Sequence, residues 1–186
     1  MKAFSNLLSD LILTSSRNRK LSLLEQYFSS TPDPDRGYAL AALTGSLNFK
    51  NIKTSFFKDL IKEKQDEHLF DLSYDYVGDL AETISLLWDQ EKGGNMPRLS
   101  SLFENLKKAK NDELKNHIIN ILNISTADQR WAFIKLFTGG LRIGVSSRLV
   151  KQALANYGNV DLEEIEKIWH GLQLPYTNLF SWLENK

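Results

Sequence analysis

Residues 138–146 read Thr-Gly-Gly-Leu-Arg-Ile-Gly-Val-Ser and form a glycine-rich turn between two stretches with helical periodicity. The three glycines lack a Cβ atom, so the backbone can approach another molecule closely. Arg142 lies between them and can bind a phosphate through two parallel hydrogen bonds. The stretch therefore favours contact with a phosphate backbone, and it is equally consistent with a tight connection between two packed helices.

The charge around this turn is one-sided. The chain as a whole is balanced, with 23 Lys and Arg against 23 Asp and Glu residues, yet no acid occurs from Gln129 to Val160. That window contains five basic residues, which are Arg130, Lys135, Arg142, Arg148 and Lys151. Two further basic clusters span residues 17–20 and 107–110. Positive patches of this kind attract phosphate, although each alone is also typical of a solvated helix end.

Apolar residues recur with a helical period along nearly the whole chain, and no alternating strand pattern interrupts them. Expected N-caps are Asp79, Asn111, either Ser146 or Ser147, and two residues with capping-box spacing, Thr126 and Asp161. We therefore predict an all-α fold, a single compact domain of roughly ten to twelve short helices over residues 1–186. A division of this body into two lobes stays open.

Composition places the chain among soluble globular proteins, because 42% of its residues are hydrophobic and 25% are charged. No apolar run is long enough for a bilayer span, and the N-terminus lacks a signal-peptide core. The absence of cysteine excludes disulfides and thiolate metal sites. We expect a cytoplasmic protein without a membrane partner.

Motifs for catalysis are missing from the sequence. His68, His117 and His170 do not form a metal-site motif, and neither a phosphate-binding Walker loop nor a serine-hydrolase elbow occurs. We expect no catalytic residue and no metal ligand in this chain, and no enzymatic activity from the chain alone.

The glycine-rich turn and the helix expected after it closely resemble a motif of the N-terminal DNA-binding domain of ATP-dependent DNA ligases. Further matches occur in the same order along the chain, at residues 4–28, 33–45, 73–83 and 169–176, and the second of these looks like the bacterial branch of the family. The resemblance implies a helical domain that holds nicked duplex DNA across the minor groove, largely through phosphates. In such ligases a nucleotidyltransferase domain and an OB-fold domain complete the enzyme.

The resemblance also implies where the chemistry of such a ligase lies. The family's catalytic lysine stands in a Lys-x-Asp-Gly motif, and residues 64–67, Lys-Gln-Asp-Glu, lack its glycine. The ATP site and the divalent-metal site are therefore expected in a catalytic domain, joined in cis or acting in trans, and no cofactor is expected here. The resemblance therefore implies a DNA-binding domain that lacks the ligase catalytic domain, either as a truncated part of a ligase or as a separately encoded fragment.

Carried over position by position, the family's DNA contacts fall on three parts of this chain. The residues are Gly139, Gly140, Leu141 and Arg142 in the turn, Ser15, Ser16 and Arg17 near the N-terminus, and Lys110 and Asn111. Gly140 can offer only its backbone, and Leu141 either contacts a sugar or anchors the turn. These contacts would give sequence-tolerant binding of nicked duplex DNA in repair, replication or recombination, with the protein at the nucleoid.

An alternative function is that of a helical adaptor for a protein partner, such as a separately encoded ligase catalytic domain. The zero formal net charge and an aromatic C-terminal segment favour it, with Trp169, Tyr176, Phe180 and Trp182 as the aromatic residues. The same aromatic residues are also typical of a packed core.

Overall fold

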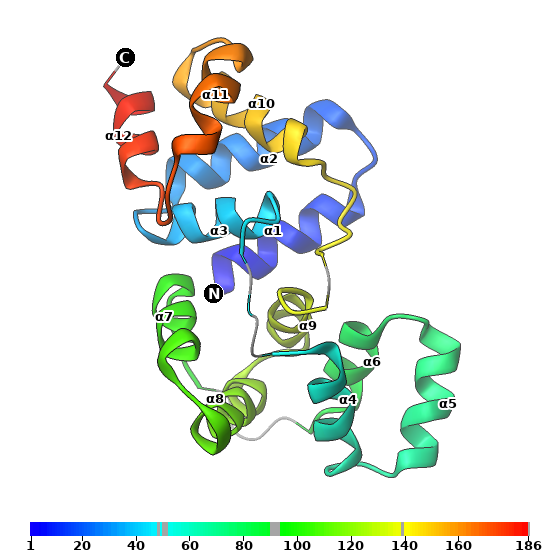
Figure 1. The fold of residues 1–186 in the computed structure, drawn as a ribbon. Coiled ribbons are helices and arrows are strands. Elements are labelled where there is room, and N and C mark those ends of the chain that lie inside the picture. The colour runs from blue at the N-terminus through cyan, green and yellow to red at the C-terminus, as the bar shows by residue number, and fades with distance from the viewer. Residues whose placement is uncertain (48, 50–51, 90–93, 139, 186) are drawn as a thin grey trace. The chain divides into compact units, whose positions relative to one another are not determined.

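The computed structural model describes residues 1–47, 49, 52–89, 94–138 and 140–185, and these form α-helices without a strand (Figure 1). The all-α prediction is confirmed. The twelve α-helices of the described part are α1 (Lys2–Leu13), α2 (Arg17–Ser30), α3 (Asp35–Leu43), α4 (Thr54–Lys62), α5 (Glu67–Val77), α6 (Leu80–Leu87), α7 (Leu99–Lys108), α8 (Asn111–Ile124), α9 (Ala127–Lys135), α10 (Ser147–Gly158), α11 (Leu162–Ile168) and α12 (Thr177–Glu184). A short 3-10 helix, η1, covers Trp169–Gly171.

The fold divides into two compact units. Unit 1 comprises Met1–Ser5 and Phe49–Leu141, and unit 2 comprises Asn6–Asn48 and Arg142–Lys186. The boundary falls inside the glycine-rich turn, between its leucine and its arginine.

Unit 1 has an aromatic core. The ring centroids of Phe133 and Phe137 in and after α9 lie 5.1 Å apart, and that of Phe57 from α4 lies 5.6 Å from Phe137. Helix α9 packs closely against α6, which in turn packs against α5. Aromatic rings bury a large apolar area, so this cluster provides much of the hydrophobic stabilisation of the unit.

Arg130 of α9 connects two helix ends inside unit 1 and is only 2% exposed. Its guanidinium donates hydrogen bonds to the carbonyls of Ser85 (2.6 Å) and Trp88 (2.8 Å) at the end of α6. It also donates to those of Leu122 (3.0 Å) and Ser125 (2.9 Å) at the end of α8. The last carbonyls of a helix receive no hydrogen bond from their own helix, so the Arg130 guanidinium supplies donors to the carbonyls at two helix ends.

Unit 2 is built around α10, which lies along α2 and also contacts α11, α12 and α3 (Figure 1). Arg36 of α3 is buried over the Phe180 ring, with its guanidinium carbon 4.2 Å from the centroid. It donates to Asp33 at 2.7 Å and to Glu184 of α12 at 2.5 Å. Hydrogen bonds from Arg36 and from the Tyr157 hydroxyl lower the pKa of the Glu184 carboxyl. This network fastens the C-terminal helix to the rest of the unit.

The helix starts test the predicted caps. The side chains of Asp79 and Ser146 accept from the backbone N–H three residues later, and Thr126 forms a complete capping box with Gln129, as predicted. The capping box at Asp161 is wrong, because the N–H of Glu164 donates to the Asp161 backbone carbonyl at 3.0 Å.

Candidate nucleic-acid interface

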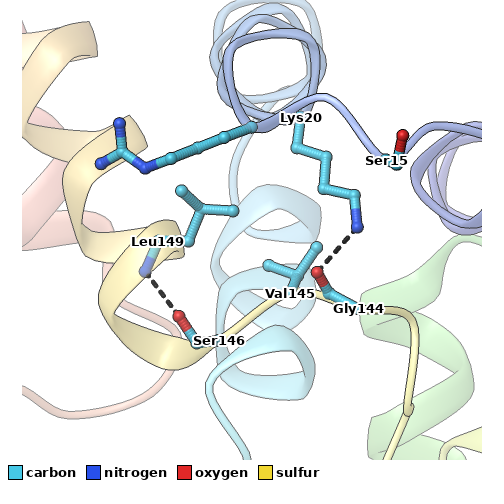
Figure 2. Close-up of a pocket in the computed structure, with 7 residues that line it drawn as sticks. Ser15, Lys20, Gly144, Val145, Ser146 and Leu149 are labelled. Carbon is cyan, nitrogen blue, oxygen red and sulfur yellow. Dashed lines mark hydrogen bonds between the residues drawn. The ribbon is translucent and has the colours of Figure 1, made fainter.

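A pocket of about 520 Å³ lies between the starts of α2 and α10 in unit 2 (Figure 2). Its lining consists of Ser15, Arg17, Lys20, Gly144, Val145, Ser146 and Leu149. The fold thus brings the N-terminal candidates Ser15 and Arg17 next to the last residues of the glycine-rich turn. These two segments are far apart in the sequence and meet because α10 packs along α2.

Two helix N-termini border this pocket, and both carry a serine cap. The Ser16 Oγ accepts from the N–H of Arg19 at 3.3 Å, and the Ser146 Oγ accepts from that of Leu149 at 3.2 Å. Neither α2 nor α10 has an acidic residue in its first turn. The first N–H groups of a helix lack intrahelical partners and form its positive end, so the pocket favours an anion such as a phosphate.

Lys20 and Gly144 are joined by a hydrogen bond at this pocket. The Lys20 Nζ donates to the Gly144 carbonyl oxygen at 2.7 Å, as Figure 2 shows. The Lys20 residue is buried, whereas Arg17 and Arg19 of the same basic cluster are exposed. In the sequence, Lys20 is one basic residue of the cluster at residues 17–20, and nothing local reveals its partner 124 positions away, so neither Lys20 nor Gly144 is among the predicted contact residues.

The turn itself alternates between buried and exposed residues. Leu141 and Ile143 are buried, at 8% and 4% exposure, which supports the anchoring role for both side chains. Gly140 and Arg142 are exposed and have positive φ angles of 113° and 49°. Gly139 falls outside the described residues. The backbone at Gly140 and the guanidinium of Arg142 are therefore what the described part of the turn presents to solvent.

Lys110 and Asn111 belong to unit 1, where α8 begins, and both are exposed. The predicted cap is wrong here, since Lys110 occupies the N-cap in an extended conformation and Asn111 enters the helix with φ 48°. The first turn of α8 contains Asp112 and Glu113, which repel a phosphate. Any anion contact at this position must come from the Lys110 ammonium rather than from the helix end.

The acid-free window presents fewer cations than its sequence indicates. The Arg130 guanidinium is buried and donates its hydrogen bonds to helix carbonyls. Lys135 is 7% exposed and forms an ion pair with Asp79. The Lys151 Nζ lies 4.7 Å from the centroid of the Trp169 ring. Of the five basic residues in this window, two are exposed to solvent, Arg142 and Arg148.

The described residues contain no group of three or more His, Cys, Asp or Glu side chains that could hold a metal ion. His117 has one carboxylate nearby, with its Nε2 3.7 Å from an oxygen of Glu113 at the surface of α8. No helix in the described ranges is long and apolar enough to cross a membrane.

A family model described as the DNA ligase N terminus matches residues 1–155 of the 186 in this chain. The matched part contains both segments of the pocket and Lys110 with Asn111. A comparison with curated proteins gave no significant match. Because the family model covers most of the sequence, the chain belongs to the family of N-terminal domains of ATP-dependent DNA ligases.

Proposed function

We propose that this chain binds duplex DNA, nicked DNA included, through phosphates across the minor groove and with little preference for sequence. The observation that carries the proposal is the pocket at which two acid-free helix starts meet. Contacts of this kind position a protein on DNA without reading bases. Because the chain belongs to the family of DNA ligase N-terminal domains, we take the anion that this pocket favours to be a phosphate of DNA.

Each candidate residue then has a distinct role. Arg17 and Arg142 supply exposed guanidinium groups that hold phosphate oxygens, and Ser15 and Ser16 lie where the chain enters α2. The backbone at Gly140 and Leu141 lets a DNA strand approach closely, and Gly139 is a further candidate by the family resemblance alone. Arg142 has a left-handed backbone, which costs a non-glycine residue roughly 1–2 kcal/mol, and such strain is concentrated at functional sites. The Lys110 ammonium, next to Asn111 at the start of α8, provides a separate contact from unit 1.

Titration of labelled nicked duplex by fluorescence anisotropy tests the proposal. Because phosphate contacts release counterions, the logarithm of the association constant should fall linearly with the logarithm of the salt concentration. Arg142→Asn keeps a residue that tolerates the left-handed backbone and should weaken binding by about 1.5–3 kcal/mol through loss of a charged hydrogen bond. The matched control, Lys167→Asn on the exposed surface of α11, should leave affinity unchanged. Affinity that is independent of salt would contradict the proposal.

We further propose that the chain serves a ligase catalytic domain, in cis or in trans, in DNA repair, replication or recombination at the nucleoid. ATP and a divalent metal would act in that domain, because the present sequence has no Lys-x-Asp-Gly motif. Adding the chain to a ligase catalytic domain should increase the rate of nick sealing at limiting DNA. No increase, with intact DNA binding, would exclude this partnership.

The adaptor function has one observation in its favour, which is an exposed apolar stripe on α5. Leu69, Leu72 and Tyr76 follow helical spacing and are 48%, 57% and 93% exposed. Of the C-terminal aromatic residues, Tyr176 and Phe180 are buried and give no such support. Recovery of a protein partner after nuclease treatment, lost in Leu72→Ser, would favour the adaptor function, and recovery of none would exclude it.

A further inference from the structure

We infer that Lys20 is a positioning residue of the DNA-binding site, which holds the start of α10 against the first turn of α2 and does not itself bind a phosphate. This inference rests on the proposed function. From sequence, Lys20 is one of three cations in a cluster at residues 17–20 that would suit direct phosphate contact. Its environment in unit 2 gives it a different task.

The first evidence is the burial of Lys20 and the partner of its ammonium group. Lys20 is 9% exposed, whereas Arg17 and Arg19 in the same turn are exposed. Its Nζ lies 2.7 Å from the Gly144 carbonyl oxygen, two residues before the N-cap of α10. A lysine that is buried and already donates to a carbonyl offers little accessible surface to a phosphate. It is instead placed to fix the turn from which α10 begins.

The second evidence is the glycine that accepts this bond. Gly144 has φ 68°, a conformation that favours glycine. A Cβ atom at this position would lie 2.7 Å from the Lys20 Nζ, closer than real Cβ contacts. The positive φ angle therefore favours glycine at position 144, and a larger side chain there would have to displace the flexible end of Lys20.

The bond has two consequences for the pocket. It links the two elements whose N-termini line the pocket, so the spacing between their unpaired N–H groups is fixed before DNA binds. It also places a cation on a carbonyl oxygen that would otherwise present its negative end to an incoming phosphate. Preorganisation of this kind raises affinity by removing the ordering cost at binding.

Two substitutions that disrupt the bond from opposite sides test this role. Lys20→Met removes the ammonium and keeps an apolar stem, whereas Gly144→Ala leaves every charge in place and displaces the ammonium. The matched control is Gly45→Ala, because Gly45 has φ 73° and no atom near its missing Cβ. Each variant is measured in two ways: its affinity for nicked duplex at several salt concentrations, and amide hydrogen exchange of Leu149 and Val150 in the DNA-free protein.

We expect Lys20→Met and Gly144→Ala to weaken binding about tenfold relative to Gly45→Ala, because the start of α10 must then be ordered when DNA binds, at a cost comparable to the one charged hydrogen bond that orders it in the free protein. The slope of affinity against salt should stay at its wild-type value, because no phosphate contact is lost. The amides of Leu149 and Val150 should exchange faster than in the wild type, in the absence of DNA.

Direct phosphate contact by Lys20 gives a different result. The salt slope of Lys20→Met would then fall by about 0.9 while amide exchange stays at the wild-type rate, and this would overturn the inference. Wild-type affinity in both variants would overturn it as well. If the wild-type protein binds no DNA, the proposed function fails, and the exchange rates still show whether Lys20 holds the start of α10.

Discussion

Removal of the Arg130 guanidinium is the most demanding stability test that this fold offers. Arg130→Met retains the buried apolar stem and deletes the donors to four helix-terminal carbonyls in unit 1. No carboxylate forms a salt bridge with this guanidinium among the described residues. Desolvation by burial is the larger influence on the pKa of Arg130 and lowers it, whereas the charge of Asp89 raises it. The stabilising effect of the guanidinium comes from the carbonyl dipoles and from the charge of Asp89.

The magnitude follows from these opposing effects. A hydrogen bond to a charged group contributes about 1.5–3 kcal/mol, so four such bonds could contribute about 6–12 kcal/mol. Desolvation of a buried ion opposes this by several kcal/mol, and breaking a buried charged interaction typically costs about 3–5 kcal/mol. We expect Arg130→Met to lower the free energy of unfolding by about 3–5 kcal/mol, a large share of the 5–15 kcal/mol of a typical domain.

Urea unfolding followed by far-ultraviolet circular dichroism measures this loss. Arg130→Lys keeps the charge but cannot reach both helix ends, so it should lose roughly half as much as the methionine variant. Arg148→Met, at an exposed position of α10, should change stability by less than about 0.5 kcal/mol. A loss below about 1 kcal/mol for Arg130→Met would refute the reasoning, because the four bonds would then barely exceed the desolvation that they offset.

Two further predictions concern an ion pair and a close backbone approach. Burial alone would raise the pKa of Asp79, but hydrogen bonds from Lys135 and from backbone N–H groups hold it below the ordinary value. Stability from this pair is thus present above pH about 4 and lost as pH falls through the lower folded-state pKa. Unfolding curves between pH 6 and pH 2 should show the gap between wild type and Asp79→Asn closing on acidification, and a constant gap would count against the ion pair. In Gly37→Ala the new Cβ would lie 1.6 Å from the Pro175 carbonyl oxygen, so we expect a loss of at least about 2 kcal/mol in thermal unfolding. Gly171→Ala meets no atom within 4 Å and should be near neutral, and equal stability of the two variants would disprove the steric argument.

Local features of the sequence predicted much of the secondary structure. Helical periodicity and caps such as Thr126 and Ser146 depend on residues three or four positions apart. The interacting groups are therefore neighbours in the sequence and can be identified from it. The predicted cap at Asn111 is wrong, because Lys110 occupies the N-cap of α8, whereas Asp161 occupies the N-cap of α11 as predicted but without the side-chain hydrogen bond of a capping box.

The candidate site was only partly predictable. The glycine-rich turn and the N-terminal segment stand out by composition and by resemblance to the ligase family. The fold joins the N-terminal segment to the last residues of the turn, Gly144 to Ser146, at one pocket, whereas Gly140, Leu141 and Arg142 are not among its lining residues. The pairing of Lys20 with Gly144 cannot be predicted from the sequence, and neither can the engagement of Arg130 and Lys135 in the acid-free window. All three cations are buried and engaged with partners in their own unit.

The sequence by itself determined that this protein is helical, where several of its helices start and to which family it is similar, because these properties depend on neighbouring residues and on residue identity. Only the tertiary structure decided which cations face solvent and which hold the fold together. Arg130 reaches a carbonyl 45 positions away, and Lys20 reaches one 124 positions away. Such pairings arise from helix packing, which brings a buried charge to the carbonyl that stabilises it and leaves the Arg142 side chain exposed to solvent.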